Sequence, residues 1–289
     1  MRRFNLTAFF AATLALAGVN AARAEPALWK VQGPHATVWL FGTIHALKPG
    51  LSWRTARLDA ALASADQLWL EIADADDPAA IQPLVARYGL DPAHPLSGVI
   101  SAADEARLER DLKSAGIPAA GVQMMRPWMA GTLVEVAPML AAGYDPDAGV
   151  DRALEKTAKA AGKPVLGLET AEQQVRYLSD MAQPEQIAFL ESALDDADKG
   201  PAELDRLMAA WAAGDVDAID KLMNQDVEMQ DAQLYRRLIV ERNQRFAARI
   251  AQLAQGSGTF LVAVGAAHLA GRDCVQRDLA KLGLEAVRQ

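Results

Sequence analysis

The sequence predicts an α/β fold in which a central mixed β-sheet is flanked by helices, with helical insertions as candidates for a cap. The strand-like segments, short runs of apolar, β-branched and aromatic residues, cluster near the two ends of the chain. The long stretches between them carry helix start and stop signals. Two of the strand-like runs end in the same pattern, a glycine followed three residues later by a histidine. A sheet assembled from both ends of the chain accounts for these observations.

Six segments are predicted as strands, and the first two form a hairpin because Gly33-Pro34 separates them. In chain order the strands are 27–32, 37–41, 67–72, 164–168, 259–264 and 284–287. Capping residues mark the helices: Asp77 precedes a proline at the start of one, and Gly116 and Gly162 follow the ends of two others. The predicted helices are 78–88, 102–115, 129–142, 151–161, 184–196, 201–213, 216–223, a long one over 227–255, and 271–282.

Residues 1–24 are predicted to be a signal peptide, and residues 25–289 a single α/β domain. A positive start at 2–3, an apolar core over 6–19 and a small-x-small cleavage site at 22–24 have the order of an export signal. The apolar core is too short for a stable membrane anchor. We therefore expect a periplasmic or secreted protein whose mature chain starts near Glu25.

Charge and cysteine content narrow the range of partners. The chain has 29 basic and 37 acidic residues, and three of the basic ones lie in the first 24 residues, so the mature chain has a formal charge of −11. This charge argues against nucleic acid and anionic membrane surfaces, and the expected partner is a peptide or a small-molecule substrate. The oligomeric state is left open.

Cys274 is the only cysteine, which excludes an intrachain disulfide, and we interpret it as a small buried hydrophobe.

The two glycine–histidine strings are the strongest candidates for chemistry. One runs from Gly42 to His45 and the other from Gly265 to His268, and the chain has only four histidines. Glycine permits a sharp turn at the end of a strand. The histidine then projects from the strand end, which is where open α/β sheets bind their ligands. We expect the two imidazoles, 223 residues apart in sequence, to meet at one site.

Two glutamates stand near the ends of otherwise apolar strands. Glu71 lies near the end of the run 68–72, and Glu169 follows the run 165–168. Each is either an edge residue that faces water or a carboxylate with a partner, because a buried, unpaired carboxylate is costly. With the two histidines they make four candidate ligands or proton carriers. Imidazole with carboxylate suits zinc, manganese, iron or cobalt, and the same set without metal supplies a general base and its orienting partner.

Other polar positions have simpler interpretations. Asp151 opens a predicted helix and is interpreted as its N-cap. His94 lies in a proline-containing turn and is interpreted as a loop residue. Arg126 and Arg242 lie on helical stretches, either as surface residues or directed at a substrate anion.

Several segments occur in order along nearly the whole mature chain: Gly42-Thr43-Ile44-His45, Glu71, Arg126-Pro127-Trp128, Gly149-Val150-Asp151, Gly167-Leu168-Glu169-Thr170, Glu241-Arg242-Asn243 and the stretch 264–271. Together they resemble the TraB/GumN family, which is grouped with the Tiki metalloproteases. The resemblance implies a fold similar to erythromycin esterase and the haem-binding ChaN proteins. It also implies a site formed by His45, His268, Glu71 and Arg242, and it suggests divalent-metal-dependent protease activity.

Three functional hypotheses follow. The first is an exported hydrolase, a divalent-metal-dependent peptidase, in which His45, His268 and Glu71 bind manganese, cobalt or zinc. Glu71 is also a candidate general base, Arg242 is expected to steady a carboxylate or an oxyanion, and Glu169 is expected to support the site or contact substrate. The second is a metal-independent, esterase-like hydrolase in which a His–Glu pair activates water. The third is a protein that binds haem, metal or peptide without turnover.

Overall fold

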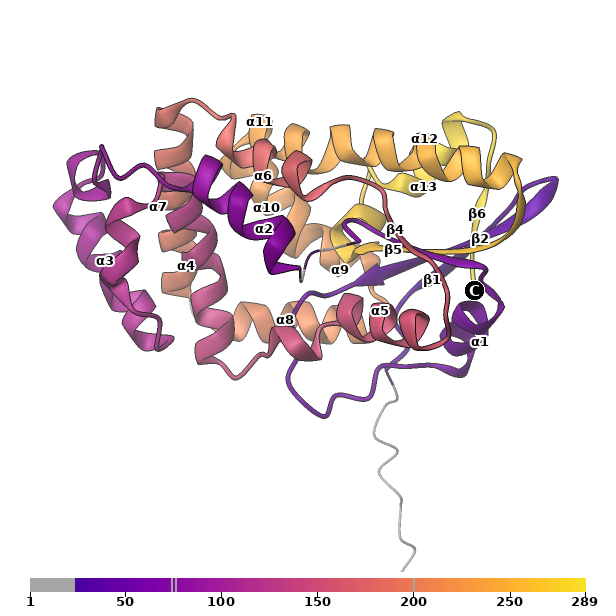
Figure 1. Cartoon of the computed structure of the whole chain (residues 1–289). Coiled ribbons are helices and arrows are strands. Elements are labelled where there is room, and N and C mark those ends of the chain that lie inside the picture. Colours follow the sequence, from indigo (N-terminus) through magenta and orange to yellow (C-terminus); the bar gives the residue numbers. More distant parts are fainter. Residues whose placement is uncertain (1–23, 74, 76, 200) are drawn as a thin grey trace, which may run out of the picture.

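The computed structural model describes residues 24–73, 75, 77–199 and 201–289. Its centre is a six-stranded sheet with the strand order β4-β3-β5-β2-β1-β6 (Figure 1). Strands β4, β3, β5 and β2 run parallel to one another, whereas β1 pairs antiparallel with β2 and with β6. The predicted mixed sheet and its starting hairpin are confirmed, and the predicted signal peptide lies almost entirely outside the described residues. The strands are β1 Leu28–Gln32, β2 His35–Thr43, β3 Gln67–Leu70, β4 Val165–Gly167, β5 Ser257–Gly265 and β6 Ala286–Arg288.

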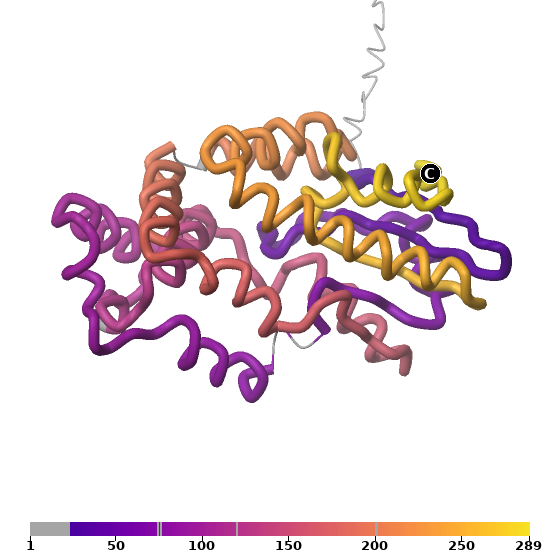
Figure 2. Tube along the Cα trace, turned by 90° about the horizontal axis from the view of Figure 1, so that it is seen from above, coloured from indigo at the N-terminus to yellow at the C-terminus, as the bar shows by residue number. Residues whose placement is uncertain are grey.

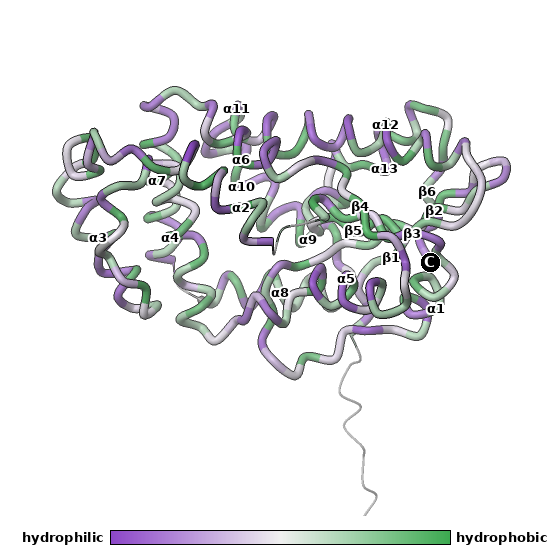
Figure 3. The backbone as a smooth tube through the Cα atoms, viewed as in Figure 1, coloured by the Kyte–Doolittle hydropathy of each residue, from purple (hydrophilic) through white to green (hydrophobic). Residues whose placement is uncertain are grey.

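Helices cover both faces of the sheet because its central strands are apolar throughout. In β5, residues 260–264 are buried one after another, which is the pattern of a strand covered on both sides. One face packs against α12 (Glu241–Gln255) and α13 (Val275–Lys281), and the other against α1 (Ala56–Ser64), α5 (Val150–Ala160) and α8 (Pro201–Ala212) (Figure 1). Figure 3 shows hydrophobic residues concentrated along the strands, while the outer side of α12 is hydrophilic.

The insertions between the strands build a helical part at one end of the sheet (Figure 2). There α3 (Ala102–Ser114), α4 (Pro127–Ala141) and α7 (Gln183–Lys199) share a core of their own, which includes Leu108, Leu112, Val134, Leu190 and Leu194. The connecting helices are α2 (Pro78–Leu84), α6 (Ala171–Ser179), α9 (Val216–Ile219), α10 (Gln225–Gln230) and α11 (Ala232–Tyr235). Across the described residues, none of the helices combines the length and apolar character needed to cross a bilayer.

Several helix predictions differ from the structure. The helices predicted over 78–88 and 216–223 are α-helical only to Leu84 and Ile219 and continue as π-helical turns. The predicted long helix over 227–255 is wrong because the chain is extended at Asp231, with φ −148° and ψ 99°. The Asp231 side chain accepts hydrogen bonds from the backbone N–H groups of Gln233 and Leu234, so it caps a new helix and ends the previous one. The last helix begins at Val275 and not at 271, since Gly271 has a φ of +81°, outside the helical region. Helices α1 and α6 were not predicted.

Candidate functional site

Parallel pairing of β2 with β5 brings the two glycine–histidine strings to the same edge of the sheet. The register places Thr43 opposite Gly265, and a histidine follows shortly after each strand end. Strand β3, the other neighbour of β5, ends at Leu70 and places Glu71 at the same edge. His268 lies on the short 3-10 helix that follows β5. The site therefore occupies the carboxyl ends of parallel strands, where α/β sheets bind their ligands.

Gly265 marks the point around which the predicted site residues converge. A methyl group on its Cα would lie 3.1 Å from Glu71 Oε1, 3.7 Å from His268 Cδ2 and 3.9 Å from His45 Nε2. The Gly265 N–H donates a hydrogen bond to Glu71 Oε1 at 2.7 Å. His268 Nε2 lies 3.6 Å from the same carboxylate oxygen. The three side chains thus surround one small space, which the absence of a side chain at Gly265 leaves free.

Each histidine is held at its Nδ1 atom by a side chain from a helix. His45 Nδ1 donates to Asp151 Oδ2 on α5 at 2.8 Å, and His268 Nδ1 donates to Asn243 Oδ1 on α12 at 2.6 Å. Asn243 in turn donates from Nδ2 to the Asp273 carbonyl at 2.7 Å, which is consistent with this orientation of its amide. Both Nε2 atoms are left for other partners, as in metal sites where a carboxylate or an amide orients the ligating imidazole.

Arg242 joins the two buried glutamates into one ion-pair network. Its Nε donates to Glu169 Oε1 at 3.0 Å, and its Nη2 donates to both Glu71 and Glu169. Gln174 on α6 donates to Glu71 Oε2 at 3.0 Å and to Glu169 Oε1 at 2.9 Å, and the Tyr177 hydroxyl donates to Glu169 Oε2 at 2.8 Å. Buried charges need such partners. Because two carboxylates share one guanidinium, the network keeps one net negative charge.

The surroundings leave Glu71 ionised and His268 neutral near pH 7. Burial disfavours the charged form of Glu71. The positive charges of His268, which is protonated only at the low pH where Glu71 titrates, and of Arg242 and His45 outweigh burial and lower the pKa of this carboxyl to about 2. Burial lowers the pKa of His268 to about 4. His45 is exposed, and its hydrogen bond to the Asp151 carboxylate raises its pKa to about 9. One carboxylate, one neutral imidazole and one imidazolium therefore face the space beside the glycine.

Two residues that hold the histidines were not predicted. The interpretation of Asp151 as an N-cap is wrong, because Gly149 occupies the N-cap position of α5 and Asp151 lies in the first turn, where it binds His45. Asn243 carries no signal of its own beyond its position directly after Arg242 in one of the segments that resemble the family. Both residues stand on helices whose distance from the histidines in sequence hides the contact.

The remaining candidates fall in different places. Glu169 lies beside Glu71 in the network, whereas Arg126 and His94 line a separate cavity. Cys274 is buried and free. Gln174 and Tyr177, which contact the buried glutamates, were missed because α6 was not among the predicted helices.

The donor set of the site suits a divalent transition metal once His45 has lost its proton, which metal binding would displace, since it then offers two imidazole Nε2 atoms and one carboxylate. Their convergence on the space that a Cβ at Gly265 would fill is the observation that fits such an ion. Within the described part of the chain, no three His, Cys, Asp or Glu side chains are already arranged as a metal-binding group. Arg242 engages Glu71 through Oε2, so that Oε1 is the oxygen that faces His268. The residues have the chemistry for a metal and would have to draw together to hold it.

Comparison with known proteins gives one match. The family model described as the TraB/PrgY/gumN family matches residues 27–288 of this chain. This range contains all six strands and the side chains of the site. No curated protein and no solved structure matches the chain.

Proposed function

The chain belongs to the TraB/PrgY/gumN family, and on this premise we propose that it is a hydrolase, specifically a divalent-metal-dependent peptidase. One observation carries the proposal: a carboxylate oxygen of Glu71 and the imidazoles of His45 and His268 surround the same small space beside Gly265. Manganese, cobalt and zinc are the ions that this donor set favours.

Each residue of the site has a proposed role that follows from its contacts. His45, His268 and Glu71 would hold the ion, which when bound polarises a scissile carbonyl and lowers the pKa of a water. Asp151 and Asn243 hold the two rings so that Nε2 faces the space beside Gly265. The exposed side of His45 is where substrate would enter, because His268 and Glu71 are buried.

Arg242 is proposed as a positioning residue and not as a group that contacts substrate. Its donors are directed at Glu71, at Glu169 and at the Leu238 carbonyl, and its side chain is only 10% exposed. Its positive charge keeps Glu71 anionic, which is the form that a metal ligand or a proton acceptor requires. Glu169 balances the arginine and fixes its orientation.

A metal-independent hydrolase is a second candidate, favoured by the neutral state of His268. An imidazole with its Nε2 lone pair free is able to take a proton from a water in the adjacent space. Glu71, whose Oε1 lies 3.6 Å from this nitrogen, would stabilise the imidazolium that forms. In this mechanism Asn243 keeps the proton on Nδ1 and leaves Nε2 as the base.

Metal content and turnover, measured together, separate these candidates. The mature chain without a histidine tag would be analysed for bound metal and incubated with a peptide library, with and without chelator. The peptidase proposal expects bound metal that is lost in His45→Ala and His268→Ala, and turnover that stops on chelation. His35→Ala is the matched control, because His35 is exposed and lies at the start of β2, at the opposite end of the strand from the site. Turnover that survives complete removal of metal contradicts metal dependence and favours the second candidate. Ligand binding without any turnover, in every metal-loaded form, contradicts both.

We further propose that the protein acts in the periplasm or after secretion, on a peptide or small-molecule substrate. The support is the order of charged, apolar and small residues in the first 24 positions and the acidic balance of the remainder. The test is N-terminal sequencing of the protein recovered from the periplasmic fraction or the medium. A chain that starts near Glu25 is expected, whereas a full-length chain found only in the cytoplasm contradicts export.

A further inference from the structure

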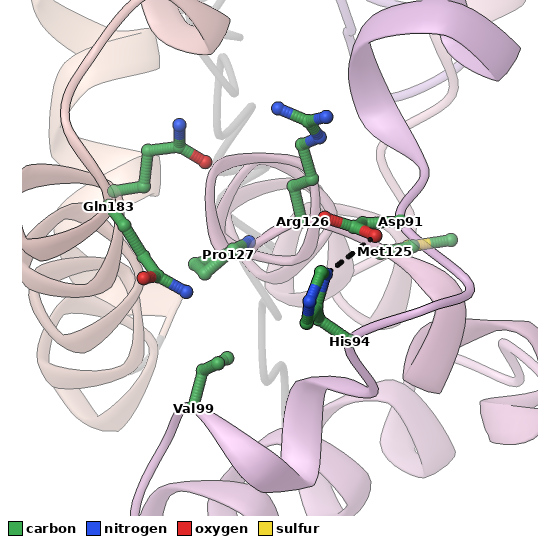
Figure 4. Close-up of a pocket in the computed structure, with 8 residues that line it drawn as sticks. Asp91, His94, Val99, Met125, Arg126, Pro127 and Gln183 are labelled. Atoms are coloured by element: carbon green, nitrogen blue, oxygen red, sulfur yellow. Dashed lines mark hydrogen bonds and ion pairs between the residues drawn. The ribbon is translucent and has the colours of Figure 1, made fainter.

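A cavity in the helical part of the molecule contains an arginine without a partner. We propose that this cavity binds a carboxylate, supplied by an acidic side chain or by the C-terminal end of a peptide. The cavity has a volume of about 290 Å³ and lies between the start of α4, the segment that precedes it and the start of α7 (Figure 4). Its polar lining consists of Asp91, His94, Arg126, Gln183 and Gln186.

Arg126 is the residue that favours an anionic ligand in this cavity. Among the arginines that the structure describes, it is the only one that is not exposed and whose guanidinium makes neither a hydrogen bond nor an ion pair. Its Nε is shielded from solvent and unpaired, while the two terminal nitrogens stay accessible. A buried unpaired N–H costs about 1–3 kcal/mol, and the buried Arg242 has its donors engaged by protein groups. The four outer N–H groups of Arg126 are thus free for a planar anion.

The rest of the lining favours a negative ligand. Arg126 is the N-cap residue of α4, a 15-residue helix whose first position is Pro127 and whose N-terminus has no side-chain cap. The partial positive charge of this helix end adds to that of the guanidinium. Gln183 faces Arg126 from the opposite side of the opening (Figure 4), and its amide is able to donate a further hydrogen bond. Asp91, the one carboxylate in the lining, pairs with His94 at 3.1 Å.

The position of the cavity points to a peptide as the source of the carboxylate, and this part of the inference rests on the proposed hydrolase function. Helix α6 begins beside Glu169, and its residues Val175 and Leu178 pack against the hydrophobic cluster that contains Trp128, which is close to Arg126 in the chain. A helix of 9 residues is about 14 Å long at 1.5 Å per residue. An extended peptide covers that length with about four residues. A substrate with a carboxylate at this spacing from the scissile bond would engage both sites.

Binding of short blocked peptides tests the cavity without requiring turnover. The probes are acetylated tetra-alanine with a free C-terminal carboxylate, the same peptide as an amide, an amidated peptide with one internal glutamate, and inorganic phosphate. Calorimetry on the mature chain should show at least one of the two carboxylate peptides binding about tenfold tighter than the neutral amide. Arg126→Gln should remove this difference. Arg206→Gln is the matched control, because Arg206 is an exposed arginine of α8 that pairs with Glu203 of its own helix and lies outside the cavity lining.

The outcomes distinguish this inference from the proposed function. The same titrations in a His45→Ala background should give the same preference for carboxylate over amide peptides, since binding in the cavity does not depend on catalysis. If the preference vanishes in this background, the carboxylate binds at the site of His45 and the inference is overturned. Equal binding of the carboxylate and amide peptides to the wild type overturns it too, as does a preference that persists in Arg126→Gln. Phosphate that binds as tightly as the peptides and displaces them overturns the peptide assignment. If Arg126→Gln does not fold, Arg126→Lys tests whether Arg126 binds the carboxylate. Lysine keeps the positive charge but lacks the planar pair of donors, so this variant should retain only part of the preference for carboxylate peptides.

Discussion

Replacing Arg242 by methionine should destabilise the protein strongly, because two buried carboxylates would lose their only shared counter-charge. The side chains of Arg242, Glu71 and Glu169 are all 10% exposed or less. Removing one partner of a buried ion pair costs about 3–5 kcal/mol, and here one guanidinium serves both carboxylates. We therefore expect a loss of about 3–5 kcal/mol in the free energy of unfolding at pH 7.5. At about 2–4 °C per kcal/mol for chains of comparable length, the melting temperature should fall by roughly 6–20 °C.

This loss should shrink as the pH falls. In the wild type the pKa of Glu71 is about 2, so the carboxylate stays ionised in mildly acidic solution. Burial raises the pKa of Glu71, and Arg242 supplies part of the positive charge that counteracts this effect. Without Arg242, the pKa of Glu71 should rise above its value in the unfolded chain. The folded variant then binds more protons than the unfolded one, so its stability rises on acidification. The gap between variant and wild type should be smaller at pH 5 than at pH 7.5.

Urea denaturation followed by circular dichroism at both pH values measures the effect. Arg245→Met is the control, because Arg245 lies one turn further along α12, is exposed, and donates to the Tyr177 hydroxyl at 2.9 Å and not to either buried carboxylate. It should change the free energy of unfolding by about 0.5 kcal/mol or less. Adding Glu169→Gln to Arg242→Met should recover part of the loss. A loss below about 1 kcal/mol at pH 7.5, or a loss that is independent of pH, would refute the description of two buried, charged glutamates held by one arginine.

Further predictions concern the space between the histidines and their orienting groups. Gly265→Ala should leave the fold intact but abolish metal binding and turnover, because its methyl group would lie 3.1 Å from Glu71 Oε1; unchanged activity in a folded variant would contradict the position of the site. His268 has a folded-state pKa of about 4, below its ordinary 6.5, so acidification from pH 6.5 to 4 should lower stability by up to about 3 kcal/mol. His268→Asn should lack this contribution, and denaturation curves of equal pH dependence in both proteins would argue against a neutral buried imidazole. Asp151→Asn should lower the pKa of His45 from about 9, which an NMR titration of the ring proton measures; an unaltered titration would show that the carboxylate is not its partner.

Much of the fold and the centre of the site were predictable, because their signals are local in the chain. Apolar runs that end at Gly42 and Gly265 mark strands on account of their composition and turn chemistry, whatever else the chain contains. Parallel strands that end in the same motif place the motifs at one edge, so His45 and His268 were expected to meet. Glu71 stood out because a carboxylate in an apolar strand requires a partner.

Helix limits were less predictable, because capping competes with helical propensity. The sequence over 227–255 reads as continuous helix, yet the Asp231 carboxylate binds the N–H groups of the next turn and divides it. The same carboxylate on the outside of a continuous helix would have left the same sequence pattern. Only the tertiary packing of the segments on either side selects one arrangement over the other.

The sequence by itself determined the composition of the sheet, the order of its elements along the chain, and the residue types available to the site. Only the tertiary structure decided which side chains pair. His45 binds Asp151 from 106 residues away, His268 binds Asn243 on another helix, and Arg126 is left without a partner at the rim of a cavity. The physical reason is that hydrogen bonds and ion pairs depend on distances of a few ångströms between groups whose separation in sequence carries no information about their separation in space. An aspartate in the first turn of a helix looks the same in sequence whether it caps the helix or holds a histidine.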